Sequence, residues 1–154
     1  MNRNDLSHTV LKEIGFRLLA EGKSIRIKAE GFSMYPSIKP GSVIFIEPYR
    51  KDVSPVPGEI IAWKKESGFV VHRVVRYYEK DAINCFVTRG DSSIAEDEPV
   101  LSVNIAGKVV RIEYPEGNPV HESHYLNKNP NYSFNRFKVW IILQFSRVKR
   151  VFAH

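Results

Sequence analysis

The chain has 154 residues, of which 43% are hydrophobic, and its formal net charge is +6. This length and composition predict one folded domain over residues 1–154 and exclude a disordered chain. The single cysteine, Cys85, excludes an internal disulfide, so no residue indicates an oxidising compartment.

The first part of the chain predicts a helix. Apolar residues recur at helical spacing between positions 5 and 20, and we expect an N-terminal helix within residues 1–22. Over residues 24–114, short β-rich segments alternate with turn residues, which is typical of an all-β core. The expected fold class is therefore mainly β.

Ser33 lies in the turn that follows the first expected strand. Gly31 permits a sharp change of direction there, and Pro36 fixes one backbone dihedral after the serine. Such a stiff bend can hold a nucleophile beside outward-pointing backbone N–H groups, including that of Met34, which would stabilise an oxyanion. The residues of this segment alone favour a serine that only caps a turn.

His72 lies in an apolar, β-branched run, and two aspartates, Asp91 and Asp97, lie in an acidic turn further along. A free histidine has a pKa of about 6.5, so it can act as a neutral base without the burial that a lysine base requires. A carboxylate beside it would fix the tautomer and stabilise the imidazolium. The alternatives are a core histidine and a solvated turn, with Arg73 paired to the acidic loop.

The last forty residues predict a loop and then a helix. Residues 115–130 are rich in Pro, Asn, His and Gly, and residues 131–151 predict a basic amphipathic helix. One interpretation packs this helix on the domain with its basic rim in solvent. The other docks it on anionic lipid or on an acidic protein. Its basic residues are Arg136, Lys138, Arg147, Lys149 and Arg150.

Several classes of partner and compartment are not expected. No nucleic-acid-binding motif is present, and His121 and His124 lack a zinc-site pattern, so we expect no nucleic acid, metal or cofactor. No apolar run near either end approaches the roughly 20 residues that span a bilayer, and no secretory signal is evident. We expect a cytoplasmic protein that can associate peripherally with a membrane.

Five segments, in order, resemble the sequence boxes of the signal peptidase I family, within the serine-peptidase group that includes the self-cleaving SOS repressors. The resemblance extends from about residue 25 to residue 111. The boxes are Ser33-Met34-x-Pro36-x-Ile38-x-x-Gly41, Gly58-Glu59-Ile60-Ile61-Ala62-Trp63, His72-Arg73-Val74-Val75, Thr88-Arg89-Gly90-Asp91 with Asp97, and Ile105-Ala106-Gly107-Lys108-Val109-Val110. The His-Arg pair is similar to the endoplasmic-reticulum and archaeal branch, whereas bacterial-type members have a lysine base.

The resemblance implies a coiled β-sheet domain and a serine endopeptidase that cleaves a leader or signal peptide after small residues. Ser33 would be the nucleophile, His72 the base and Asp97 the orienting acid, with Asp91 in a supporting or alternative role. The chain departs from the family at Ser42, where an acidic residue is usual. It also departs at Gly31, where a hydroxyl often binds the oxyanion, and we expect no hydrophobic anchor of the usual kind before the serine. These departures leave open an inactive peptidase-like binding module, peripheral to a membrane or an acidic partner.

Overall fold

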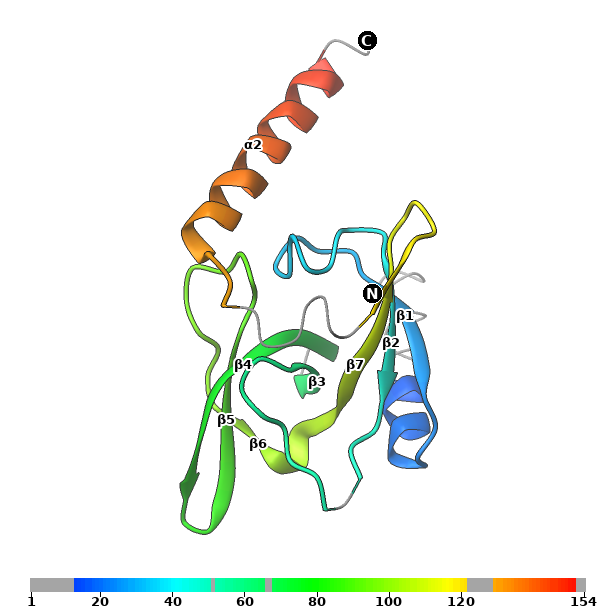
Figure 1. Cartoon of the computed structure of the whole chain (residues 1–154), viewed down its shortest axis with the longest axis vertical. Coiled ribbons are helices and arrows are strands. Elements are labelled where there is room, and N and C mark those ends of the chain that lie inside the picture. The colour runs from blue at the N-terminus through cyan, green and yellow to red at the C-terminus, as the bar shows by residue number, and fades with distance from the viewer. Residues whose placement is uncertain (1–12, 51, 66–67, 122–128, 152–154) are drawn as a thin grey trace, which may run out of the picture.

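An antiparallel β-sheet forms the body of the protein (Figure 1). The structure is a computed structural model that describes residues 13–50, 52–65, 68–121 and 129–151. The order of the strands across the sheet is β1-β2-β7-β3-β4-β5-β6, with β8 paired to β7. The elements are β1 (Ile25–Lys28), β2 (Val43–Glu47), β3 (Ile60–Lys65), β4 (Gly68–Lys80), β5 (Ile83–Arg89), β6 (Val100–Leu101), the 3-10 helix η1 (Ser102–Asn104), β7 (Ile105–Glu113), β8 (Pro119–His121) and α2 (Tyr132–Val151).

Strand β3 is covered on both faces. Ile60 and Ala62 belong to one hydrophobic cluster, whereas Ile61 and Trp63 belong to a second. Because successive side chains of a strand point to opposite faces, the two clusters lie on opposite sides of the sheet at β3. The continuous apolar run of this strand is therefore explained by burial on both faces, and the expected mainly-β class is confirmed.

Strand β4 is long and changes partner along its length. Its first half, up to Arg73, pairs with β3, and its second half pairs with β5. The register shifts between Val74 and Arg76, which marks a bulge. His72 and Arg73 therefore lie where the strand passes from one neighbour to the next, and this crossing brings them close to the loop that follows β5.

Gly107 allows two strands to approach closely. A Cβ atom added to this glycine would overlap the backbone carbonyl of Glu47 on β2. The pairing of β7 with β2 is also irregular between Phe45 and Ile46. Only a residue without a side chain fits this contact, which gives a packing reason for the glycine in the expected closing strand.

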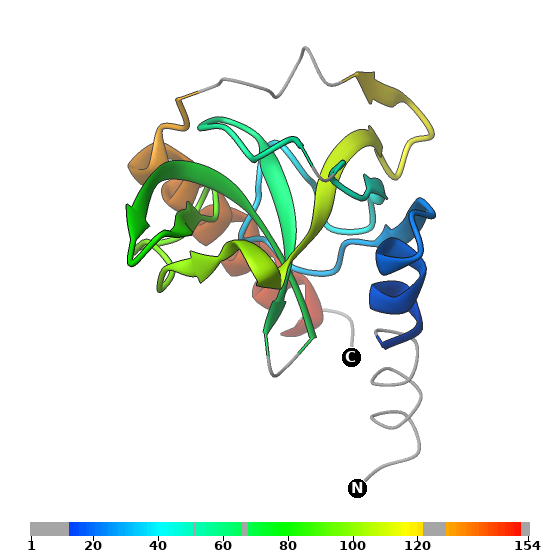
Figure 2. The ribbon, with the colours of Figure 1, turned by 90° about the horizontal axis from the view of Figure 1, so that it is seen from below.

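A helix lies at the N-terminal side of the sheet beside β1 (Figure 2). Residues 13–20 are helical, and the helix ends at Gly22, whose positive φ of 80° suits the left-handed position after a helix. Leu19 is buried in the core, and the ring of Phe16 stacks on Phe69 of β4 at 3.8 Å between centroids. The expected helix also included residues 1–12, which lie outside the described residues.

The C-terminal part differs from expectation in two ways. The expected loop contains β8, because a turn closed by Gly117 and stabilised by the Tyr114 N–H bond to the Asn118 carbonyl returns the chain to β7. Helix α2 agrees closely with the expected residues 131–151, but it extends away from the sheet instead of lying on it (Figure 1). Within the described part of the chain, no helix is sufficiently long and apolar to cross a membrane.

Candidate active site

Ser33 lies on a tight turn that is anchored on either side of it. The side chains of Met34 and Ile38 are buried, and the Ile38 N–H donates to the Met34 carbonyl at 2.9 Å. The Tyr35 N–H donates to the Phe32 carbonyl at the same distance. These contacts fix the backbone of the turn while Ser33 itself remains exposed. The sequence thus builds a rigid loop that presents a hydroxyl to solvent.

His72 is held by a carboxylate. Its Nδ1 lies 2.6 Å from Oδ2 of Asp97, and the same oxygen accepts a hydrogen bond of 2.6 Å from Oγ1 of Thr88. The backbone N–H of Asp97 also donates to the Thr88 carbonyl at 2.8 Å. Because an ionised carboxylate only accepts hydrogen bonds, Nδ1 carries the proton of the neutral imidazole. The lone pair then resides on Nε2, the atom that a general base requires.

Two opposing influences act on the pKa of Asp97. Burial of the carboxyl raises the pKa, but hydrogen bonds from His72 and Thr88 lower it, with further lowering by the positive charges of His72 and Lys65. The lowering influences prevail, so the pKa of Asp97 lies below its ordinary value. Asp97 is therefore ionised at neutral pH and able to stabilise a positively charged imidazole.

Gly90 lies between the serine turn and the histidine. A Cβ atom added at Gly90 would lie 2.6 Å from the carbonyl oxygen of Ser33 and 3.0 Å from Nε2 of His72. The neighbouring Ser92 clamps the same turn, since its N–H donates to the Ser33 carbonyl at 2.9 Å and its hydroxyl to the Phe32 carbonyl at 2.6 Å. The free nitrogen of the imidazole is therefore directed at the segment that carries Ser33.

The hydroxyl of Ser33 makes no hydrogen bond to His72 among the residues that the structure describes. Catalytic hydrogen bonds are often long in the absence of substrate and shorten in the complex. Asp97 thus orients the imidazole through Nδ1, while Nε2 lies beside Gly90, which also approaches the backbone carbonyl of Ser33.

Asp91 has a different position. Both of its carboxylate oxygens accept hydrogen bonds from the guanidinium of Arg73, at 2.8 and 2.7 Å, and the side chains are only 1% and 2% exposed. Ser37 of the serine turn donates to the same carboxylate at 2.5 Å. No hydrogen bond joins Asp91 to His72 in the described residues. Asp91 is therefore buried between Arg73 of β4 and the turn that carries Ser33, and it connects the two.

Backbone donors are available for an oxyanion. In the described residues, no group accepts a hydrogen bond from the N–H of Ser33 or of Met34. Gly31 contributes no side chain, and a Cβ atom added there would meet nothing within 4 Å. The arrangement can therefore offer backbone N–H groups to a developing negative charge beside the serine.

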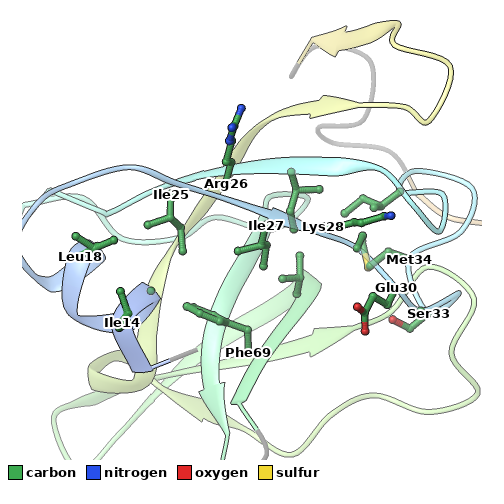
Figure 3. A pocket seen from close by; sticks show the side chains of 16 residues that line it. Ile14, Leu18, Ile25, Arg26, Ile27, Lys28, Glu30, Ser33, Met34 and Phe69 are labelled. Atoms are coloured by element: carbon green, nitrogen blue, oxygen red, sulfur yellow. The ribbon is translucent and has the colours of Figure 1, made fainter. Parts of the chain in front are cut away.

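A pocket of about 630 Å³ begins at Ser33 and extends toward the N-terminal helix (Figure 3). Figure 3 shows Ser33, Met34 and Glu30 at one end, and Ile14, Leu18 and Phe69 at the other. Residues of β1 and of the first half of β4 line its walls. Among the residues that the structure describes, β1 pairs only with β2, and this half of β4 pairs only with β3. Each therefore has an edge at which another strand can bind.

Four polar residues contact the site, although the sequence predicted no role for them. They hold the serine turn, the carboxylate of Asp97 and the buried ion pair in place through contacts with distant segments, and no local sequence pattern predicts such contacts. Thr88 alone carried a local signal, because its hydroxyl follows the apolar residues Cys85, Phe86 and Val87 shortly before the acidic turn. The four residues are Ser37, Thr88, Ser92 and Asn135.

In the part of the chain that is described, no three His, Cys, Asp or Glu side chains are grouped to hold a metal ion. His121 lies in β8, and His124 lies outside the described residues. No protein-family model matches the chain, and no curated protein matches it either.

Proposed function

We propose that this protein is a serine endopeptidase of the signal-peptidase type that cleaves a leader or signal peptide after small residues. The observation that carries the proposal is the position of His72, which bonds Asp97 through Nδ1 at 2.6 Å while Nε2 faces the Ser33 turn beside Gly90. The five sequence boxes support the same reaction, and the preference for small residues derives from that resemblance alone.

In the proposed reaction, Nε2 of His72 accepts the hydroxyl proton of Ser33 as Oγ attacks the carbonyl carbon of the scissile peptide bond. The imidazolium then gives this proton to the departing amine, which leaves an acyl group on Ser33. Water attacks the ester with His72 again as the base, and the free acid is released. Asp97 fixes the imidazole and stabilises its charge, and the N–H of Ser33 binds the oxyanion.

The substrate would bind as an extended chain in the pocket next to Ser33. Both β1 and the first half of β4 have free strand edges there, so a peptide can bond through its main chain. The apolar residues Ile14, Leu18 and Phe69 at the far end would receive an apolar side chain several positions from the cut. A pocket with an apolar far end suits a leader segment that has small residues at the cut and apolar residues before them.

Covalent labelling tests the proposal. A serine-directed acylating probe should modify the protein once, at Ser33, as located by mass spectrometry of the digested protein. Ser33→Ala should abolish labelling, whereas Ser102→Ala, which removes another exposed serine, should leave it unchanged. Leader peptides with alanine before the cut should be cleaved by the wild type and not by Ser33→Ala. Equal labelling of the wild type and Ser33→Ala would refute the mechanism.

The alternative function is an inactive peptidase-like module that binds peptides. The specific observations in its favour are the missing bond between Ser33 and His72 and the lack of a hydroxyl at Gly31. This alternative predicts that leader peptides bind in the pocket but are recovered uncut, with no labelling of Ser33. Peptide binding by calorimetry combined with mass spectrometry of the products distinguishes the two functions.

A further inference from the structure

Helix α2 has one face that no part of the described protein covers. Its first turns contact the body, where Asn135 donates to the Asp91 carbonyl at 2.8 Å and Arg136 reaches the Ser93 carbonyl at 3.4 Å. Beyond them the helix extends outward (Figure 1). Four aromatic residues of α2 are more than half exposed: Phe134 at 51%, Phe137 at 55%, Trp140 at 58% and Phe145 at 66%. So much exposed aromatic surface on one helix indicates a binding face.

The exposed aromatic residues and the half-buried Ile141 form a continuous strip. Phe134, Phe137, Ile141 and Phe145 are spaced three or four residues apart, so they lie along one side of the helix. The rings of Phe137 and Trp140 stack at 6.2 Å between centroids. We call this side, formed by Phe134, Phe137, Trp140, Ile141 and Phe145, the aromatic face.

Basic residues border the aromatic face on both sides. Lys138 and Lys149 are eleven residues apart, and so are Arg136 and Arg147; this spacing is close to three helical turns and keeps each pair in line. Each pair follows one border of the aromatic face, and Lys138 lies 4.5 Å from the ring of Phe134. Helix α2 contains no aspartate or glutamate. An apolar strip between two basic rows is the pattern of helices that lie in a membrane interface.

We propose that α2 is a docking helix that binds the surface of an anionic lipid bilayer. Phenylalanine and tryptophan side chains enter the boundary between headgroups and acyl chains, and the lysines and arginines on either side contact anionic headgroups. A second copy of this chain is a less suitable partner for the aromatic face. Pairing two α2 helices would bring two sets of five positive charges together, and these charges repel each other.

The attachment of α2 places this surface in a fixed relation to the candidate active site. Asn135 and Arg136 bond the residues Asp91 and Ser93, and the same loop contains Gly90 beside Ser33 and His72. Arg89 adds a contact of 3.6 Å over the ring of Tyr132. Docking would therefore hold the site at a constant height above the bilayer, whether or not Ser33 is catalytic.

Vesicle binding of the full chain tests the proposal, with Trp140 as the reporter. The chain has two tryptophans, and the other, Trp63, is buried. Vesicles of phosphatidylcholine with phosphatidylglycerol should sediment the protein and shift the tryptophan emission to shorter wavelength. Pure phosphatidylcholine should bind far more weakly, and salt should weaken binding to the anionic vesicles. Trp140→Phe should remove the spectral shift but retain sedimentation.

Two sets of variants separate the contributions. Replacing Lys138, Arg147, Lys149 and Arg150 with glutamine should weaken binding about a thousandfold. Matched removal of four exposed charges elsewhere, at Lys23, Arg50, Lys65 and Lys80, should weaken it far less. Phe137→Ser with Phe145→Ser should abolish the emission shift, whereas Val53→Ser with Val103→Ser, which alters other exposed apolar residues, should not.

The outcomes that overturn the proposal are distinct. Absence of binding to anionic vesicles would refute it, and so would equal loss of binding in the helix variants and their matched controls. Binding of a soluble acidic polymer without binding of vesicles would assign α2 to an acidic protein instead. Self-association that depends on α2, again without vesicle binding, would assign it to a second copy. Ser33→Ala should bind vesicles as the wild type does, so failure of the enzyme proposal leaves this test intact.

Discussion

At the residue scale, the two aspartates that follow β5 have separate tasks. Asp97 bonds His72 and Thr88 near the surface, whereas Asp91 is fully buried against Arg73. The resemblance to signal peptidases implied Asp97 as the orienting acid, and the structure places it beside His72. Sequence alone could not place Asp91, because its partners Arg73, Ser37 and Asn135 come from three segments that meet only in the fold.

The lowered pKa of Asp97 predicts a pH dependence of stability. Its ionised form is favoured in the folded state, so its contribution to the free energy of unfolding is complete above about pH 4, where an ordinary aspartate is ionised. The contribution is lost as the pH falls through the lowered pKa. In urea unfolding, the advantage of the wild type over Asp97→Asn should therefore be larger at pH 5 than at pH 3. An advantage that grew toward low pH would contradict this assignment.

The buried ion pair predicts a large effect of a single substitution. Arg73→Met leaves the carboxylate of Asp91 buried without its guanidinium, and the free energy of unfolding should fall by about 3–5 kcal/mol. The matched control is Arg76→Met, which removes the partner of Glu96 in a far more exposed pair and should cost no more than about 1 kcal/mol. Similar losses in the two variants, measured by urea unfolding, would show that the burial of the pair has little effect.

At the scale of elements, the strands were predictable and their partners were not. Alternation and β-branched runs predict β2, β3 and β4, because burial of alternate side chains is a local property. The change of partner along β4, the short β8 and the outward direction of α2 depend on contacts between distant segments. The direction of α2 is the clearest case, since packing on the domain and docking elsewhere require the same amphipathic pattern.

The contact between β7 and β2 predicts intolerance of a methyl group. Gly107→Ala would force the new Cβ atom into the Glu47 carbonyl, so the strands must separate and the free energy of unfolding should fall by about 1–3 kcal/mol. Gly31→Ala is the control, because open space surrounds that position and its stability should be unchanged or higher by up to about 1 kcal/mol. Wild-type stability in Gly107→Ala would mean that the two strands can separate at no cost.

At the scale of the whole molecule, the N-terminal helix and the sheet together form the pocket. Ile14 of the helix, Ile27 of β1 and Phe69 of β4 line it, and Ser33 is at its end. No single element creates this pocket, which explains why the sequence predicted a serine on a turn but no binding groove. Helix α2 adds a second surface, because it extends away from the sheet (Figure 1).

The pocket predicts where peptide affinity arises. Ile14→Asp introduces a charge into the apolar end of the groove, so KM for a leader peptide should rise roughly tenfold with little change in kcat. Ile83→Asp is the matched control, since Ile14 and Ile83 are 48% and 44% exposed and Ile83 lies on the distant β5. Equal KM values for the two variants in steady-state peptide cleavage would show that this end of the pocket does not bind the substrate.

The central claim is that His72 activates Ser33, and the rate at which Ser33 is acylated measures it most directly. The experiment compares the wild type with His72→Gln, using a serine-directed probe and mass spectrometry of the Ser33 peptide at neutral pH. Loss of the base should slow acylation by about 10²–10⁴-fold while the protein remains folded by circular dichroism. Acylation of Ser33 at the same rate in both proteins would contradict the account.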